Sequence, residues 1–145
     1  MYQFSATEPI PDDLLRELIG KLKDFRIWCL EGKLGAGKTS LIRSIGNLLG
    51  FGDQVSSPSF SVIQPYECST NPLGLDLVYH MDLYRLHNVQ EAQDAGVLDC
   101  VYSGELCIIE WPELILPLLE HEKYAILNIQ VNTNNGRDYR LNTFE

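Results

Sequence analysis

Residues 26–50 read RIWCLEGKLGAGKTSLIRSIGNLLG and contain an apolar segment, a glycine-rich loop and a second apolar segment. The first six residues are mostly apolar, which predicts a short buried strand. In Ser40–Leu49 the apolar side chains recur at helical spacing, which predicts a helix that ends at Gly50. A strand that leads into a helix through such a loop is typical of α/β proteins.

The loop itself, Gly32–Thr39, matches the pattern G-x-x-x-x-G-K-[ST] at every required position. Its glycines let the backbone turn back so that N–H groups point inward, and the start of the next helix adds a positive end. We expect Lys38 to reach the β- and γ-phosphates of a nucleotide and Thr39 to ligate Mg²⁺. The pattern predicts nucleoside triphosphate binding by Gly32, Leu34, Gly35, Ala36, Gly37, Lys38, Thr39 and Ser40.

Two acidic residues follow predicted strands elsewhere in the chain. Asp82 comes directly after Leu77–Met81, and Glu110 comes directly after Leu106–Ile109. In a parallel sheet both carboxylates lie at the edge that carries the phosphate loop. We expect one of them to help hold Mg²⁺ and the other to orient the attacking water.

The remaining sequence predicts helices and strands around this unit. Their expected positions are helices over residues 11–23 and 89–96, strands over residues 60–65, 77–81, 106–109, 124–131 and 139–144, a turn over residues 68–76, and a short helical or irregular segment over residues 112–117. Asn134-Asn135-Gly136 is typical of a hairpin turn between the last two strands. The pattern favours a three-layer α/β fold like that of P-loop NTPases, with a mixed, largely parallel central sheet and a late C-terminal hairpin.

Composition limits the organisation and the class of partner. The 145 residues suggest a single domain over residues 1–145, with 45% hydrophobic and 21% charged residues. The formal net charge of −9 argues against stand-alone binding to nucleic acid, which needs clustered Lys and Arg. No apolar run is long enough to cross a membrane, and the first residues do not read as a signal peptide. The four cysteines have no metal-binding spacing and indicate reduced thiols, so we expect a cytoplasmic protein.

Four separate blocks together resemble a known family. They are Leu34–Thr39 (LGAGKT), Ser57–Ser61 (SPSFS), His80–Leu86 (HMDLYRL) and Ile109–Glu113 (IEWPE), in this order. The combination resembles the bacterial TsaE (YjeE) family of small P-loop ATPases over roughly residues 5 to 140, and it is far more specific than the phosphate loop alone.

The resemblance implies an accessory role in making threonylcarbamoyladenosine, the modified adenosine next to the anticodon in tRNAs that read ANN codons. Family members bind a complex of TsaD and TsaB, and their ATP hydrolysis supports its repeated turnover. We therefore expect a Mg²⁺-dependent ATPase of low intrinsic activity, with Mg²⁺ as cofactor and ATP as substrate. Contact with tRNA would be indirect, through the complex. The sequence leaves the oligomeric state open.

The resemblance also implies roles for single residues. Asp82 would be the Walker-B-like acid needed for hydrolysis, Glu110 would join Thr39 at the metal, and Trp111 would be a functional aromatic near the site or a partner surface. The loop with Ser57, Ser59 and Ser61 would resemble switch I of GTPases, although the family usually has threonines at the last two positions. The nucleotide would also lie near Glu8, Gly136 and Arg137.

Other P-loop functions remain as alternatives. A small kinase that transfers phosphate to a small molecule or nucleotide usually has an Arg-rich lid, and after Arg43 this chain has only Arg85, Arg137 and Arg140. A GTPase would need the N-K-x-D and D-x-x-G motifs, which the sequence does not contain. A nucleotide sensor that does not hydrolyse would retain the loop without needing the two acids.

Overall fold

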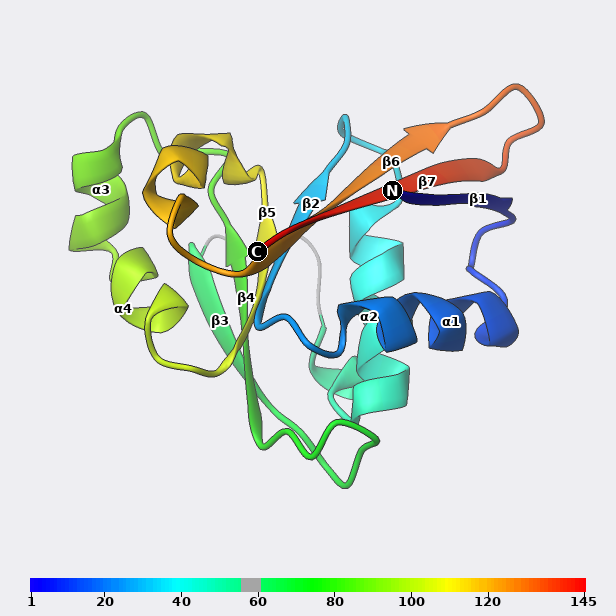
Figure 1. Ribbon diagram of the computed structural model, residues 1–145, viewed down its shortest axis with the longest axis horizontal. Helices are drawn as coiled ribbons and strands as arrows, with labels where there is room; N and C mark the ends of the chain where they lie inside the picture. Colours follow the sequence, from blue (N-terminus) through cyan, green and yellow to red (C-terminus); the bar gives the residue numbers. More distant parts are fainter. Residues whose placement is uncertain (56–60) are drawn as a thin grey trace.

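A seven-stranded sheet forms the centre of the computed structural model, which describes residues 1–55 and 61–145 (Figure 1). The spatial order of the strands is β1-β7-β6-β2-β5-β4-β3. In chain order they are β1 (Tyr2–Ala6), β2 (Ile27–Glu31), β3 (Ile63–Glu67), β4 (Leu77–Asp82), β5 (Leu106–Glu110), β6 (Tyr124–Val131) and β7 (Arg137–Phe144). Strands β6, β2, β5 and β4 are mutually parallel, whereas β3, β7 and β1 are antiparallel to their neighbours. The sheet is mixed with a parallel centre, as the sequence predicts.

Helices cover both faces of this sheet. Figure 1 shows α1 (Asp12–Leu22) and α2 (Lys38–Leu49) on one side, and α3 (Val89–Asp94) and α4 (Val97–Val101) on the other. The described residues also form three short 3₁₀ turns: η1 (Gly52–Gln54), η2 (Pro112–Leu114) and η3 (Leu116–Leu119). No helix in the two described ranges is long and apolar enough to cross a membrane.

Two hydrophobic clusters fill the space between the layers. Because neighbouring side chains of a strand point to opposite faces, Trp28 and Leu30 of β2 pack with α1 and α2, whereas Cys29 packs with α3 and α4. The indole N–H of Trp28 donates to the carbonyl oxygens of Leu22 and Phe25, at 3.2 and 2.8 Å. These bonds join the end of α1 to the strand that enters the phosphate loop.

Several boundaries differ from those predicted. Helix α2 begins at Lys38 rather than Ser40, β3 covers residues 63–67 rather than 60–65, and β7 begins at Arg137 rather than Tyr139. Helix α4 was not predicted. Helix α3 ends at Asp94 rather than residue 96, and Gly96, at φ 87°, caps the start of α4 as a separate short helix.

Strand β1 was also not predicted from the sequence. Its five residues alternate between half-buried and exposed, and they pair antiparallel with β7 from Tyr2↔Leu141 to Ala6↔Arg137. Such an edge strand buries too little apolar surface to give a local signal, and it forms because β7 supplies backbone hydrogen-bond partners.

Candidate functional site

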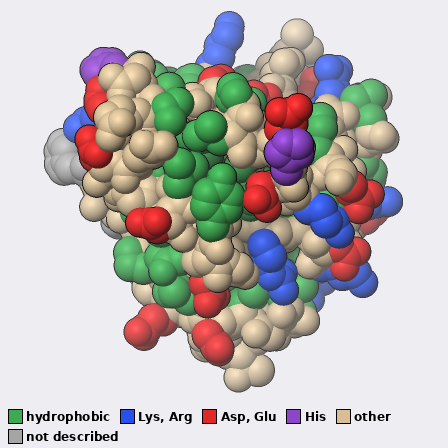
Figure 2. Space-filling view, turned by 60° about the vertical axis from the view of Figure 1, so that its left-hand side comes forward, with side chains coloured by type: hydrophobic (Ala, Val, Ile, Leu, Met, Phe, Trp, Pro, Cys, Tyr) green, Lys and Arg blue, Asp and Glu red, His purple; other side chains and the backbone are tan. Residues whose placement is uncertain are grey.

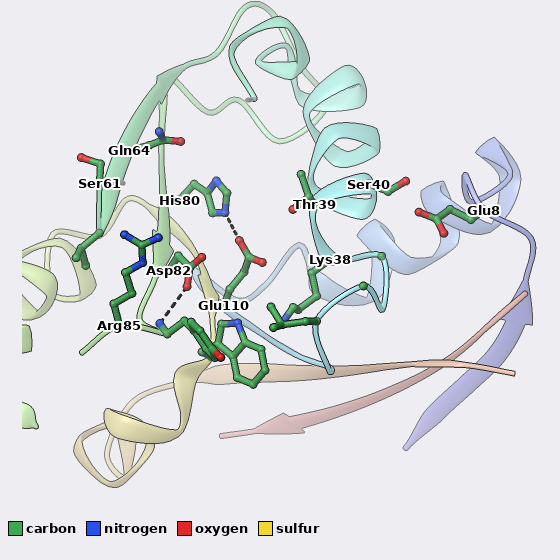
Figure 3. A pocket seen from close by; sticks show the side chains of 16 residues that line it. Glu8, Lys38, Thr39, Ser40, Ser61, Gln64, His80, Asp82, Arg85 and Glu110 are labelled. Carbon is green, nitrogen blue, oxygen red and sulfur yellow. Dashed lines mark hydrogen bonds and ion pairs between the residues drawn. The ribbon is translucent and has the colours of Figure 1, made fainter. Parts of the chain in front are cut away.

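A cavity of about 520 Å³ opens where the phosphate loop and the carboxyl ends of β4 and β5 meet (Figure 3). Parallel strands bring these segments to one edge of the sheet, although they are far apart in the chain. The lining includes these predicted site residues: Glu8, Leu34, Gly35, Gly37, Lys38, Thr39, Ser40, Ser61, Asp82, Glu110 and Trp111. Gly32 and Ala36 line a neighbouring cavity that also borders Trp111.

Two glycines of the loop have backbone angles that favour glycine. Gly35 has φ 80° and Gly37 has φ 104°, in the left-handed region where a Cβ causes strain. Gly37 precedes the first residue of α2, so the N–H groups of that helix end open onto the cavity. At Gly32 the constraint is contact, because a Cβ there would lie 2.8 Å from the carbonyl oxygen of Ile129.

The ammonium group of Lys38 is held at the mouth of the loop by two contacts. Its Nζ donates to the carbonyl oxygen of Gly32 at 2.6 Å and lies 3.6 Å from the centre of the Trp111 ring. The side chain is only 5% exposed. Burial lowers the pKa of Lys38, and the carboxylates of Glu110 and Asp82 oppose that shift.

The two acids are neighbours at the sheet edge. Asp82 and Glu110 are register partners at the ends of β4 and β5, so their side chains lie on the same face of the sheet. The Tyr84 N–H donates to Asp82 Oδ1 at 3.0 Å, and the Leu83 N–H donates to the Glu110 carbonyl oxygen at 3.1 Å. Both carboxylates therefore project from backbone that is held in place by hydrogen bonds.

A chain of buried hydrogen bonds leads from Glu110 across β4 to β3. His80 Nε2 lies 2.6 Å from Glu110 Oε2, and His80 Nδ1 lies 2.8 Å from the hydroxyl of Tyr66. That hydroxyl donates to Gln64 Oε1 at 2.8 Å. Burial, with a smaller contribution from Glu110, raises the pKa of Tyr66 to about 12, so the phenol keeps its proton at neutral pH.

Trp111 borders the cavity next to Glu110. Its ring centre lies 4.9 Å from that of Tyr84 and 3.6 Å from the Lys38 ammonium. The backbone of Trp111 has φ 54° and ψ 58°, a left-handed conformation that is uncommon for a residue with a side chain. A strained backbone angle beside a phosphate loop is typical of a functional position.

Arg137 and Glu8 support the loop from the side of β7 and β1. Arg137 Nε donates to the Ala36 carbonyl oxygen at 2.7 Å, and its Nη2 forms an ion pair with Glu8. Gly136 accepts a bond from Arg137 Nη1 at 3.1 Å. Glu8 lines the cavity, and Arg137 holds the loop backbone at Ala36.

The predicted switch loop is only partly described. Ser57 and Ser59 lie outside the described residues, and Ser61 lines the cavity. The sequence reasoning did not assign Gln64, Tyr66 or Tyr84 to the site. For Gln64 and Tyr66 the available signal was the alternation of side chains along β3, which puts both on the face of the sheet that carries His80.

The oxygen donors around the cavity suit Mg²⁺. Thr39 supplies a hydroxyl, and Asp82 and Glu110 supply carboxylates, which are the hard ligands that Mg²⁺ prefers. Among residues 1–55 and 61–145, no three His, Cys, Asp or Glu side chains are grouped so that they could hold a metal ion by themselves. The donor set therefore fits an ion that takes its other ligands from phosphate oxygens and water, as in phosphate-loop proteins.

Comparison with known proteins gives a consistent result. The family model described as "Threonylcarbamoyl adenosine biosynthesis protein TsaE" matches residues 7–140. The TsaE protein of Treponema pallidum is 30% identical over 122 residues, which cover 83% of this chain and 85% of that protein. The TsaE protein of Haemophilus influenzae is 34% identical over 120 residues, covering 75% of this chain and 72% of that protein.

The fold also has a counterpart among solved structures. The crystal structure of YdiB from Bacillus subtilis superposes with a TM-score of 0.60 and covers 98% of this chain and 84% of its own. The two sequences are 24% identical in that comparison, so this likeness concerns the fold alone.

Proposed function

The chain belongs to the TsaE family of tRNA threonylcarbamoyladenosine biosynthesis proteins, and on this premise we propose that its cavity binds and hydrolyses ATP. The observation that carries the proposal is the cavity itself. It unites residues of the phosphate loop, Lys38 and Thr39 among them, with two carboxylates at neighbouring strand ends. Binding alone would need only the loop, whereas hydrolysis needs acidic groups beside the phosphates.

Each lining group has a role in this proposal. The N–H groups of the loop and the start of α2 bind the phosphates, and Lys38 exchanges the Gly32 carbonyl oxygen for phosphate oxygens. Thr39 and Glu110 hold Mg²⁺, which when bound neutralises charge on the β- and γ-phosphate oxygens. Asp82, whose Oδ1 is fixed by the Tyr84 N–H, orients the attacking water.

The energy of hydrolysis supports turnover of a TsaD–TsaB complex, which is the family role that the sequence resemblance implies. The net charge of −9 favours a protein partner over direct binding to tRNA. Figure 2 shows acidic side chains spread among basic ones over the face to which α3 and α4 contribute. We therefore propose that the partner holds the tRNA and that this chain contacts it only through the complex.

Phosphate release from Mg²⁺-ATP by the purified chain tests this function, measured with and without a TsaD–TsaB complex. We expect slow hydrolysis alone and a faster rate with the complex. Asp82→Asn should abolish the stimulated rate, and Asp99→Asn, which changes an exposed acid of α4, should preserve it. A rate of phosphate release that is the same with and without the complex contradicts partner coupling. Transfer of phosphate to a small acceptor would indicate a kinase instead.

A further inference from the structure

We propose that His80 is a positioning residue that holds the Glu110 carboxylate in the orientation in which it meets the metal ion. This inference rests on the proposed ATPase function and deepens it. His80 does not reach the phosphate loop itself, because its Nε2 is 2.6 Å from Glu110 Oε2 and its Nδ1 is 2.8 Å from the Tyr66 hydroxyl. It therefore acts through Glu110.

The contact fixes one of the two carboxylate oxygens. A carboxylate can only accept hydrogen bonds, so His80 Nε2 carries the proton in this pair. Figure 3 shows Oε2 directed at His80 and the other oxygen of Glu110 directed toward the side of the cavity where Thr39 lies. Without the histidine, the plane of the Glu110 carboxylate could turn at little cost, because the last torsion of the side chain has a broad minimum.

The imidazole is itself held from the opposite side. The Tyr66 hydroxyl lies 2.8 Å from Nδ1 and 2.8 Å from Gln64 Oε1, so both ring nitrogens have a polar neighbour. Tyr66, His80 and Glu110 are all buried, with exposed fractions of 3%, 7% and 6%. Buried hydrogen bonds of this kind strengthen one another and restrict rotation.

The position of the chain of bonds is unusual for a purely structural network. It crosses three neighbouring strands at the level of the cavity, and Gln64, His80 and Glu110 all line that cavity. Partners that orient metal ligands commonly contribute about 10- to 100-fold to metal affinity or activity.

Two substitutions of similar size separate positioning from packing. In glutamine, the amide nitrogen lies as many bonds from Cβ as Nε2 does in histidine, so His80→Gln keeps a donor for Glu110. In asparagine, the amide nitrogen corresponds to Nδ1, so His80→Asn keeps the contact with Tyr66 and loses the one with Glu110. We expect His80→Asn to lower kcat/KM for Mg²⁺-ATP about tenfold, and His80→Gln to stay within about threefold of the wild type.

Metal affinity gives a second measurement that does not depend on turnover. Mn²⁺ can be titrated by electron paramagnetic resonance in the presence of a non-hydrolysable ATP analogue. We expect His80→Asn to weaken Mn²⁺ binding about tenfold in the wild type and to change nothing further when Glu110→Gln is already present. The affinity for the analogue in EDTA should be the same in the wild type, His80→Asn, Glu110→Gln and the variant that carries both substitutions.

Mn²⁺ affinities of these four proteins and of His80→Gln decide the inference. Equal losses of Mn²⁺ affinity in both backgrounds, or a loss for His80→Gln as large as for His80→Asn, would overturn it. A wild type that binds Mn²⁺ with the analogue but never releases phosphate contradicts the proposed ATPase function. The Mn²⁺ titration still decides the role of His80 in that case.

Discussion

Replacement of Trp111 by alanine and by glycine tests both its strained backbone and its exposed ring. Trp111 is only half-buried, and its ring contacts Lys38 and Tyr84. A cation over an indole contributes about 0.5 to 2 kcal/mol, and a tilted aromatic pair contributes about 0.5 to 1.5 kcal/mol. Trp111→Ala should therefore destabilise the fold by about 1 to 3 kcal/mol, which a domain of this size survives.

The backbone angle makes a separate contribution. At φ 54° a residue with a Cβ is strained, whether it is tryptophan or alanine, and glycine is not. After subtraction of the greater freedom of glycine in the unfolded chain, Trp111→Gly should be more stable than Trp111→Ala by about 1 kcal/mol. This difference corresponds to about 2 to 4 °C in Tm.

Thermal unfolding of the two variants measures this difference, and Mg²⁺-ATP hydrolysis measures the role of the ring. Both variants should fold and both should be impaired in hydrolysis, because both lose the ring beside Lys38. Tyr102→Ala, which removes an aromatic side chain that is 57% exposed, is the control and should keep its activity. If Trp111→Gly is no more stable than Trp111→Ala, the backbone at this position is not strained. If both variants are unfolded at room temperature, Trp111 is needed for the core rather than for hydrolysis.

Three further predictions concern the loop, its support and the thiols. Lys38→Ala should weaken ATP binding, whereas Asp82→Ala should lower hydrolysis more than binding, and isothermal titration beside a phosphate assay distinguishes the two; equal loss of binding would contradict the division of roles. Arg137→Lys should weaken nucleotide binding about three- to tenfold by titration, because lysine cannot donate to a loop carbonyl and pair with a carboxylate in the same fork; unchanged affinity would show that the loop holds its shape unaided. Burial raises the pKa of Cys107 to about 12 and raises that of Cys29 further, so iodoacetamide at pH 8 should label neither thiol until guanidinium unfolds the chain, as read by mass spectrometry. Since the unfolded Cys107 thiol titrates near 9.0, the free energy of unfolding should fall as the pH rises from about 9 to about 12, and Cys107→Ala should reduce that fall.

Local patterns predicted most of the central sheet. The apolar run before the phosphate loop, the helical spacing after it and the two strands that end in acids all form as expected. These signals are strong because each comes from neighbouring residues that must be buried together. The sequence did not predict strand β1 and helix α4, because an edge strand and a five-residue helix bury too little apolar surface to produce a periodic pattern.

The site shows the same division. The sequence predicts that Asp82 and Glu110 lie close together, because parallel strands end at one edge of the sheet. In the structure the two residues are register partners. No pattern could pair His80 with Glu110 through Nε2, because a residue type does not specify which atoms meet across strands. The resemblance predicts Arg137 near the nucleotide, and the structure adds its hydrogen bond to the Ala36 carbonyl oxygen of the loop.

The amino-acid sequence by itself determined the α/β class, the phosphate loop and the order along the chain of β2 to β7, since these depend on local spacing and on backbone freedom at glycines. The tertiary structure alone decided which side chains face one another. It set the contact of Trp111 with Lys38, the bonds from Gln64 to Glu110 and the pairing of β1 with β7. Such contacts join residues from distant parts of the chain, and their geometry depends on strand register and side-chain rotamers, which no single segment of the chain specifies.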